Sequence, residues 1–153
     1  MYSKKYLMIF FFFICLWCFG IISPVFFHHE KVYQLAKPFL NLAYSRVCHQ
    51  SHEKTISFWG ENIFVCSRCA GIYLGILLTG FLAIIFSTTP LRIFYFLLLS
   101  LILMFIDVSS TTIGIYNYSK SFALLTGLLS GSALLLFVLE QLNYFKKQSN
   151  YEK

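Results

Sequence analysis

Charged side chains are scarce in this sequence. Asp, Glu, Lys and Arg make up 12% of its 153 residues, about half of the roughly 25% that is usual in soluble proteins. Hydrophobic residues reach 58% and aromatic residues 20%, which is more than the interior of a soluble domain of this length can bury. These proportions disfavour a soluble enzyme, a disordered chain and a secreted disulfide-linked domain. They predict an integral membrane protein.

Several sequence signatures of catalysis are also missing. The sequence contains neither of the glycine-rich strings that bind nucleotide phosphates, Gly-x-x-x-x-Gly-Lys and Gly-x-Gly-x-x-Gly. It has no Gly-x-Ser-x-Gly nucleophile elbow and no His-Glu-x-x-His motif. The formal charge of +6 does not indicate a nucleic-acid partner, because the basic residues flank apolar runs instead of forming a stripe among aromatic residues. We expect contacts with membrane lipids and no nucleic acid.

Four apolar runs are long enough for transmembrane helices, which need about 20 residues to cross a hydrocarbon layer roughly 30 Å thick. We predict spans at about 6–27, 70–87, 91–113 and 122–140. The first run is longer than the apolar part of a signal peptide and no cleavage site closes it, so we expect a retained anchor. The predicted fold class is therefore an all-α membrane protein, with a single integral membrane domain over residues 1–153.

The orientation of this domain follows less directly from the sequence. Four spans place both termini on one side of the membrane, but six basic residues fall on each side, so the positive-inside rule decides only weakly. The first helix usually dominates, and Lys4 and Lys5 precede its apolar run. We predict a multi-pass protein of the cell membrane with cytoplasmic termini and an extracytoplasmic loop over residues 28–69.

The first half of this loop has the pattern of an amphipathic helix. Between Lys31 and Val47, apolar residues recur at spacings of about three to five. Such a helix lies along the membrane surface with its apolar face toward the lipid, and we expect it to bend near Pro38.

The second half of the loop has the pattern of a β-hairpin. Residues 55–58 alternate between polar and apolar, residues 59–62 are turn-forming, and residues 63–65 can form the returning strand. A hairpin here would bring Cys66 back toward the segment that follows Cys48.

Three of the five cysteines lie in this loop. Cys66 and Cys69 are three residues apart where the second span begins, and the helix N-terminus together with Arg68 favours their thiolate forms. With a third thiol and an imidazole they could hold zinc or another soft divalent metal in a tetrahedral site. The predicted ligands are Cys48, Cys66, Cys69 and one imidazole, from His49 or His52. We expect Gln50 and Arg68 to orient these ligands.

The same thiols admit two other interpretations. In an oxidising compartment two of them could form a structural disulfide. Alternatively, Cys66 and Cys69 could exchange disulfides with a partner protein. The remaining two cysteines, Cys15 and Cys18, lie in the middle of the first span, where thiols behave as small hydrophobic side chains.

One acidic residue, Asp107, lies within the third predicted span. A carboxylate at such depth is costly unless it is paired or faces a polar cavity. Asp107 is expected in the outer half of its helix, on the side of the membrane that carries the loop cysteines. Either it pairs with Lys120 or Arg68, or it is a ligand, a substrate contact or a proton acceptor. In the last case it is the candidate catalytic residue, as the base for a metal-bound water.

Two Gly-x-x-x-Gly strings, Gly71 with Gly75 and Gly127 with Gly131, let helices approach closely. They could pack within one bundle, or they could form a face for a homo-oligomer or a partner membrane protein. A third functional hypothesis, a small transport or assembly component with Asp107 on the path, needs such an oligomer because four spans are few for a transporter.

Several of these motifs occur together in a recognisable order. They are Cys48-His49-Gln50, Ser57-Phe58, the string from Val65 to Gly75 that contains Cys66-Ser67-Arg68-Cys69, Asp107, Asn117, and Thr126-Gly127 with Gly131. In this order they resemble a family of small bacterial multi-spanning membrane proteins classed only as a domain of unknown function. The sequence departs from that pattern at His52, Ile56 and Val108. The resemblance covers about residues 48–131 and implies the membrane class and the cysteine site, but no reaction.

Overall fold

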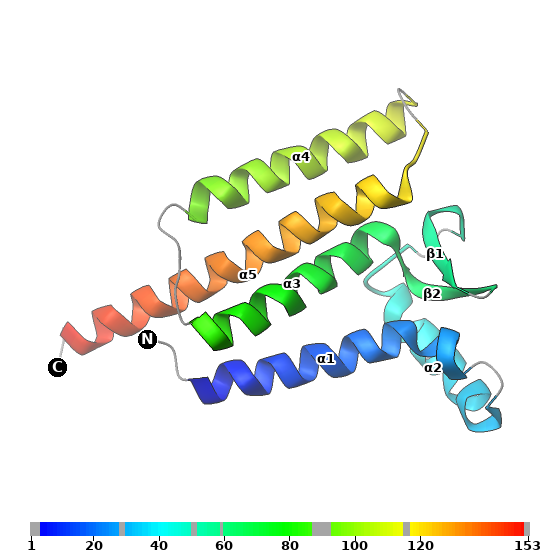
Figure 1. Cartoon of the computed structure of the whole chain (residues 1–153), viewed down its shortest axis with the longest axis horizontal. Coiled ribbons are helices and arrows are strands. Elements are labelled where there is room, and N and C mark those ends of the chain that lie inside the picture. Colours follow the sequence, from blue (N-terminus) through cyan, green and yellow to red (C-terminus); the bar gives the residue numbers. More distant parts are fainter. Residues whose placement is uncertain are drawn as a thin grey trace.

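The computed structural model describes residues 4–27, 30–49, 52–58, 60–86, 93–114 and 117–151. In chain order, its elements are α1 (Lys4–Phe27), α2 (Lys31–Ser45), the 3-10 turn η1 (His52–Lys54), β1 (Thr55–Phe58), β2 (Glu61–Cys66), α3 (Ser67–Phe86), α4 (Ile93–Ile113) and α5 (Lys120–Tyr151). Figure 1 shows four long helices, with the shorter helix α2 and the hairpin inserted between the first two of them. The predicted fold class is confirmed.

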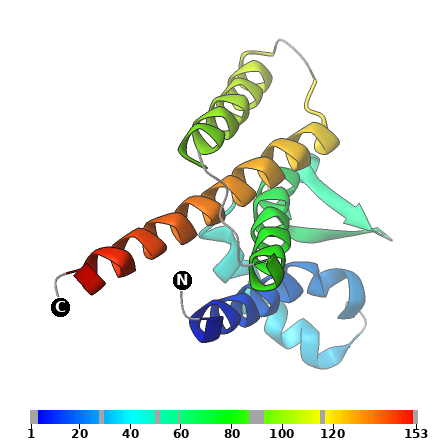
Figure 2. The ribbon, with the colours of Figure 1, turned by 60° about the vertical axis from the view of Figure 1, so that its left-hand side comes forward.

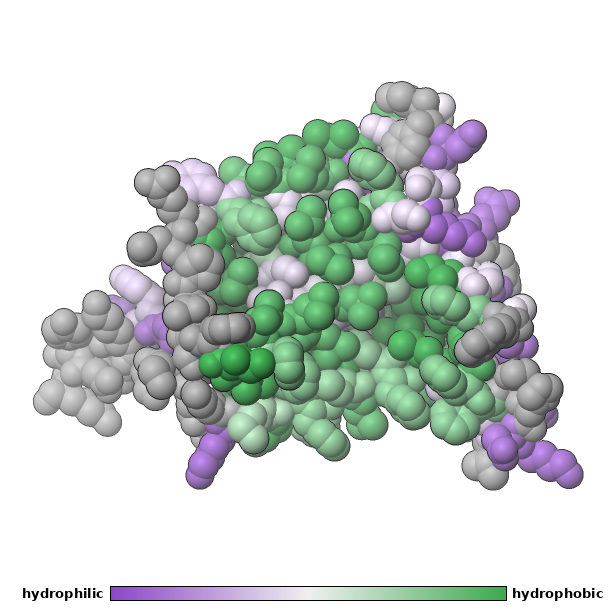
Figure 3. Space-filling model, viewed as in Figure 1, coloured by the Kyte–Doolittle hydropathy of each residue, from purple (hydrophilic) through white to green (hydrophobic). Residues whose placement is uncertain are grey.

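Each long helix contains a segment that is long and apolar enough to cross a membrane. These segments are Leu7–Phe27, Ser67–Ile85, Ile93–Ile113 and Lys120–Tyr144. Figure 3 shows a broad apolar surface across the middle of the helices and hydrophilic residues toward both ends. Large apolar side chains exposed over such an area require a lipid environment. The predicted span boundaries at residues 87 and 91 lie outside the described residues.

The two central helices are α3 and α5, with α4 packed on α5 and α1 packed on α3 (Figures 1 and 2). α1 also packs on β2. The start of α1 and the end of α5 lie at one end of the bundle, whereas α2, η1 and the hairpin lie at the other, here called the loop end. The last turns of α5 project past the other helices, because this helix continues to Tyr151, beyond the apolar run predicted as the fourth span.

The contact between α3 and α5 is a close approach of two backbones. Each glycine of the two Gly-x-x-x-Gly strings lies against a carbonyl group of the other helix, so that an added Cβ would collide with it: Gly71 with Leu124, Gly75 with Leu128, Gly127 with Arg68 and Gly131 with Ile72. These pairs advance together along both helices, which therefore run parallel. Small residues permit such close packing within a membrane, and here both strings are engaged within one chain.

The hairpin closes through a two-residue turn. Phe58 pairs with Glu61 across the antiparallel strands. Gly60 in the turn has φ +85°, a backbone conformation that residues other than glycine rarely adopt. β2 begins at Glu61, two residues earlier than the predicted strand. The added strand residues are stabilised by pairing, since Ser57 pairs with Asn62 and its hydroxyl donates a 2.6 Å hydrogen bond to Oδ1 of Asn62.

Tyr44 anchors the C-terminal end of α2 to the rest of the loop end. Its buried ring stacks on Phe64 of β2 at a centroid distance of 5.4 Å and meets the edge of Trp17 of α1 at 4.7 Å. Its hydroxyl donates a 2.9 Å hydrogen bond to the carbonyl oxygen of Trp17. α2 itself is continuous through Pro38 and ends at Ser45, two residues before the predicted limit.

Candidate metal centre

The position of Cys48 follows from the way α2 ends. The backbone N–H groups of Val47 and Cys48 both donate to the carbonyl oxygen of Tyr44, at 3.1 and 3.0 Å, so the chain turns sharply after the helix. Because Tyr44 is fixed against α1 and β2, this turn buries Cys48 in the apolar core of the loop end.

The hairpin positions the other two cysteines. Cys66 is the last residue of β2 and pairs with Thr55, while Cys69 lies in the first turn of α3. The hydroxyl of the buried Ser67 donates a 2.9 Å hydrogen bond to the carbonyl oxygen of Lys54. This bond ties the junction between strand and helix to the start of the hairpin, and thereby holds Cys66 and Cys69 opposite Cys48.

The sulfur atoms of Cys48, Cys66 and Cys69 all lie within 4.8 Å of one another. Cys48 is buried, Cys66 and Cys69 are half-buried, and all three are free thiols. The backbone N–H of Cys66 donates a 3.1 Å hydrogen bond to Sγ of Cys48. Sulfur atoms bound to one tetrahedral zinc ion lie about 3.8 Å apart, given Zn–S bonds of about 2.3 Å. The donor set fits a soft metal ion after a small contraction.

The thiol of Cys66 is held in an environment that favours its thiolate. A hydrogen bond from the Cys69 thiol is the largest effect, and it lowers the pKa of Cys66 to about 5 although burial acts in the opposite direction. Hydrogen bonds from the Cys69 backbone, the Cys48 thiol and the Arg68 backbone act in the same sense. A thiolate is the form that binds metals and attacks disulfides.

Of the two predicted nitrogen ligands, only the side chain of His49 lies within the described residues. The side chain of His49 is exposed and does not join the three sulfurs in the described part of the chain. His52 lies in η1, but its side chain is outside the described set, as is Gln50 altogether. Cys15 and Cys18, also free thiols, lie in α1 and are not members of this group.

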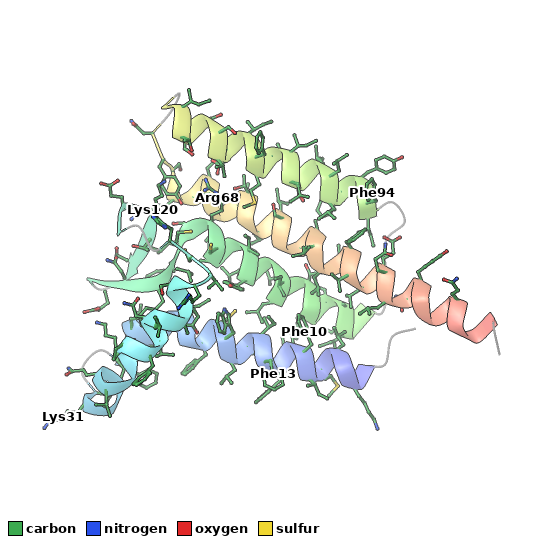
Figure 4. The ribbon with its side chains drawn as sticks, turned by 180° about the vertical axis from the view of Figure 1, so that it is seen from behind. Phe10, Phe13, Lys31, Arg68, Phe94 and Lys120 are labelled. Atoms are coloured by element: carbon green, nitrogen blue, oxygen red, sulfur yellow. The ribbon has the colours of Figure 1, made fainter. Side chains whose placement is uncertain are left out.

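Arg68 and Asp107 form a buried ion pair beside the thiols. Arg68 follows directly on the strand-to-helix junction, and its Nε donates a 3.1 Å hydrogen bond to Oδ2 of Asp107, with Nη2 donating to the same oxygen. The side chains are 15% and 4% exposed. Of the two basic partners that the sequence offers to Asp107, the structure pairs it with Arg68. Figure 4 shows Arg68 at the loop end of the bundle.

Two residues that the sequence analysis did not single out complete this polar region. The ring of Tyr118, between α4 and α5, lies 5.7 Å from Cζ of Arg68 and 5.6 Å from Nζ of Lys54. Both distances are within the range of cation–π attraction. Neither Tyr118 nor Lys54 has a spacing relation to the cysteines, so no sequence pattern could have indicated them.

The fold and the thiol group together define a class of protein: a four-span helical membrane protein with a cysteine cluster at one end of its bundle. The chain belongs to the family described as "Predicted membrane protein (DUF2085)", whose match covers residues 48–137, more than half of the sequence. That match includes the three clustered cysteines, Asp107 and all four glycines of the contact between α3 and α5.

Two curated relatives resemble the chain, and both come from archaea, whereas the resemblance in sequence suggested a bacterial family. The chain is 28% identical to the uncharacterized protein MJ1492 of Methanocaldococcus jannaschii over 65% of its own length and 66% of that protein. It is 59% identical to an uncharacterized protein of Methanothermobacter thermautotrophicus over 19% of its own length and 26% of that protein. The chain thus covers less than two thirds of either relative. No solved structure matches it significantly.

Proposed function

We propose that this membrane protein binds a soft divalent metal ion, zinc being the first candidate, through Cys48, Cys66 and Cys69. The observation that carries the proposal is the convergence of three sulfur atoms within 4.8 Å from segments 18 residues apart in the chain. Three protein ligands leave one position of a tetrahedral site for His49, for His52 or for a ligand from solution.

The surroundings of the sulfur atoms support this assignment. The hydrogen bond from the Cys66 N–H to Sγ of Cys48 orients that sulfur and stabilises its negative charge, which is the role of outer groups at metal sites. Arg68 supplies a positive charge next to the thiols in sequence, and Asp107 holds its guanidinium in place. A bound ion would supply Lewis-acid character or structural stability at this position.

Metal analysis of the purified protein tests the proposal. The full chain, purified in detergent under reducing conditions, is expected to carry one zinc ion per molecule, or to take up one Co²⁺ ion with a thiolate-to-cobalt absorption band. Cys48→Ser and Cys66→Ser each remove a ligand and should abolish stoichiometric binding. Cys15→Ser is the matched control, because Cys15 is a free thiol in α1 outside the group. A metal-free protein that cannot be loaded would refute the proposal.

The membrane side of this site is part of the same proposal. We infer that the loop end faces the extracytoplasmic side and that the start of α1 and the end of α5 lie in the cytoplasm. Lys31→Cys places a thiol at the exposed start of α2. In a background lacking the other cysteines, a membrane-impermeant maleimide added to intact cells should label this residue. Labelling only after the cells are opened would show that the loop end faces the cytoplasm instead.

Thiol–disulfide exchange is a second candidate, favoured by the hydrogen bond between the Cys66 and Cys69 thiols. The Cys66 thiolate would attack a partner disulfide and form a mixed disulfide, which Cys69 would resolve. A Cys66–Cys69 disulfide would form as the partner gains two thiols. Acid trapping and alkylation in isolated membranes distinguish the candidates: a disulfide fraction that responds to added oxidant and reductant supports exchange, whereas thiols protected until a chelator is added support metal binding.

A further inference from the structure

An apolar groove of about 490 Å³ opens at the loop end between α1, the hairpin and α3. Its volume is within the range of about 300–1,000 Å³ that is typical of ligand sites. Ile22 and Phe26 of α1 and Leu74 of α3 line the groove and are 38%, 63% and 40% exposed. All three belong to the candidate membrane spans, so the groove opens toward the hydrocarbon of the bilayer.

The groove extends along the spans away from the loop end. On α1 it runs from Cys18 to Phe26, a distance of about 12 Å at a rise of about 1.5 Å per residue. An extended hydrocarbon chain parallel to the helices would fit such a shape, and the walls offer it only apolar contact.

A smaller hollow of about 260 Å³ adjoins the groove at the loop end, and its lining combines polar groups with a larger apolar surface. The two share Ile56 and Leu124 as wall residues. The polar side of this hollow, here called the polar notch, is formed by Ser57 of β1 and by Lys120 and Ser121, the first two residues of α5. The apolar groove and the polar notch are therefore neighbours, bordered by the same two side chains.

The electrostatics of the polar notch favour an anion. Lys120 is exposed and brings a positive charge to it, and Figure 4 shows this residue at the loop end of the bundle. The first backbone N–H groups of α5 add the positive end of the helix dipole. Ser121 contributes a hydroxyl group within the same hollow, whereas the Ser57 hydroxyl already donates its hydrogen to Asn62.

We propose that this combined site binds one anionic phospholipid from the surrounding membrane, with an acyl chain in the groove and the phosphate beside Lys120 and Ser121. An anionic phospholipid has its acyl chains inside the bilayer and its negative phosphate at the surface. The site has the same arrangement, with the apolar groove along the spans and Lys120 at their end. The proposal is independent of a metal at the cysteine cluster, because none of the three clustered cysteines lines either hollow.

Lipid retention by the full-length protein tests this assignment. The protein is incorporated into nanodiscs of equimolar phosphatidylglycerol and phosphatidylcholine, extracted into detergent, and examined by native mass spectrometry for lipid that stays bound. Wild-type protein is expected to retain one phosphatidylglycerol in preference to phosphatidylcholine. Lys120→Gln should reduce that preference about fivefold, the effect of one lysine near an anionic surface. Leu74→Trp should fill the groove and remove retention of either lipid.

Two control variants are matched to these changes. Lys31→Gln removes another exposed lysine at the loop end, which Figure 4 shows at the far corner from Lys120. Leu99→Trp enlarges an exposed leucine of α4 that lines neither hollow. Both should retain lipid as the wild type does. Ile22→Trp, on the opposite wall from Leu74, provides a second blocking variant if Leu74→Trp is not monodisperse.

Three results would overturn the proposal. One is equal retention of the two lipids by wild-type protein. Another is retention that both Leu74→Trp and Ile22→Trp leave unchanged. The third is displacement of phosphatidylglycerol by inorganic phosphate alone, which would assign the notch to a soluble anion instead of a lipid.

Discussion

Arg68 donates two hydrogen bonds to a single carboxylate oxygen, Oδ2 of Asp107, across 39 residues of chain. The pair joins the first turn of α3 to α4, the most exposed of the four candidate spans. It therefore connects the cysteine-bearing junction to a helix whose other contacts are mainly with α5.

Removing one partner of this pair should destabilise the protein more than removing both. Asp107→Ala leaves a buried guanidinium without its counter-ion, a change that typically costs about 3–5 kcal/mol. The double variant Arg68→Met/Asp107→Leu removes both charges, and its free energy of unfolding should be much closer to that of the wild type. The measurement is SDS-induced unfolding in mixed micelles, with the exposed Lys5→Ala as control. A double variant as unstable as Asp107→Ala would show that the pairing is not the cause.

The glycines of the α3–α5 contact should not tolerate a methyl group. In Gly75→Ala the new Cβ meets backbone of α5, which cannot move aside, and overpacking of this kind costs about 1–3 kcal/mol. Gly80→Ala, in the same helix, is the control. There the nearest atoms are side-chain carbons of Phe11 and Leu135 at 3.3 and 3.5 Å, which can yield. In detergent, the midpoint of thermal denaturation of Gly75→Ala should be well below that of Gly80→Ala. Equal midpoints would contradict the close approach of α3 and α5.

Tyr44 and Gly20 should show favourable coupling in a double-mutant cycle. Tyr44→Phe loses the hydrogen bond to Trp17, at a cost of about 0.5–1.5 kcal/mol. Gly20→Ala drives its new methyl group into the Tyr44 hydroxyl, whereas without that oxygen the nearest ring atom is 3.3 Å away. The double variant is therefore expected to be more stable than the sum of the single changes. Strict additivity of the unfolding free energies would argue against this contact.

The reactivity of Cys66 in metal-free protein should depend little on pH near neutrality. With its pKa lowered to about 5, Cys66 is already a thiolate, so alkylation by iodoacetamide should change less than about twofold between about pH 6.5 and about pH 8. Cys69→Ala removes the main hydrogen bond and returns the pKa toward about 8.5. The rate should then rise more than about tenfold over the same interval, as the thiolate fraction grows. Peptide mapping of the labelled protein gives both rates. An equally steep profile in the wild type would contradict the hydrogen-bond assignment.

Local properties of the sequence were sufficient to predict the membrane class, the four apolar helices and the hairpin between the first two. Each depends on residues that are neighbours in the chain: an uninterrupted apolar run, or an alternating segment beside Gly60. The limits of β2 and α5 were less predictable. Glu61 and Asn62 have turn-forming character but are paired to β1, and α5 continues helical beyond its apolar part to Tyr151.

The proximity of Cys48 to Cys66 could be anticipated because a hairpin reverses the chain between them. The surrounding groups could not be anticipated in the same way. Tyr118 and Lys54 lie on either side of the cysteine motif in sequence, and Lys54 and Arg68 meet at the Tyr118 ring only because α4 and α5 return to the loop end.

The sequence by itself determined which segments cross the membrane and which cysteines are candidates to act together, because hydrophobic length and residue spacing are properties of short stretches of chain. Only the tertiary structure decided that Asp107 pairs with Arg68 and not with Lys120. It likewise decided that the glycines of α3 face those of α5, and that an apolar groove adjoins the hollow lined by Lys120. Each of these depends on how helices distant in sequence pack side by side, and that packing is set by the fit of whole surfaces and not by any local pattern.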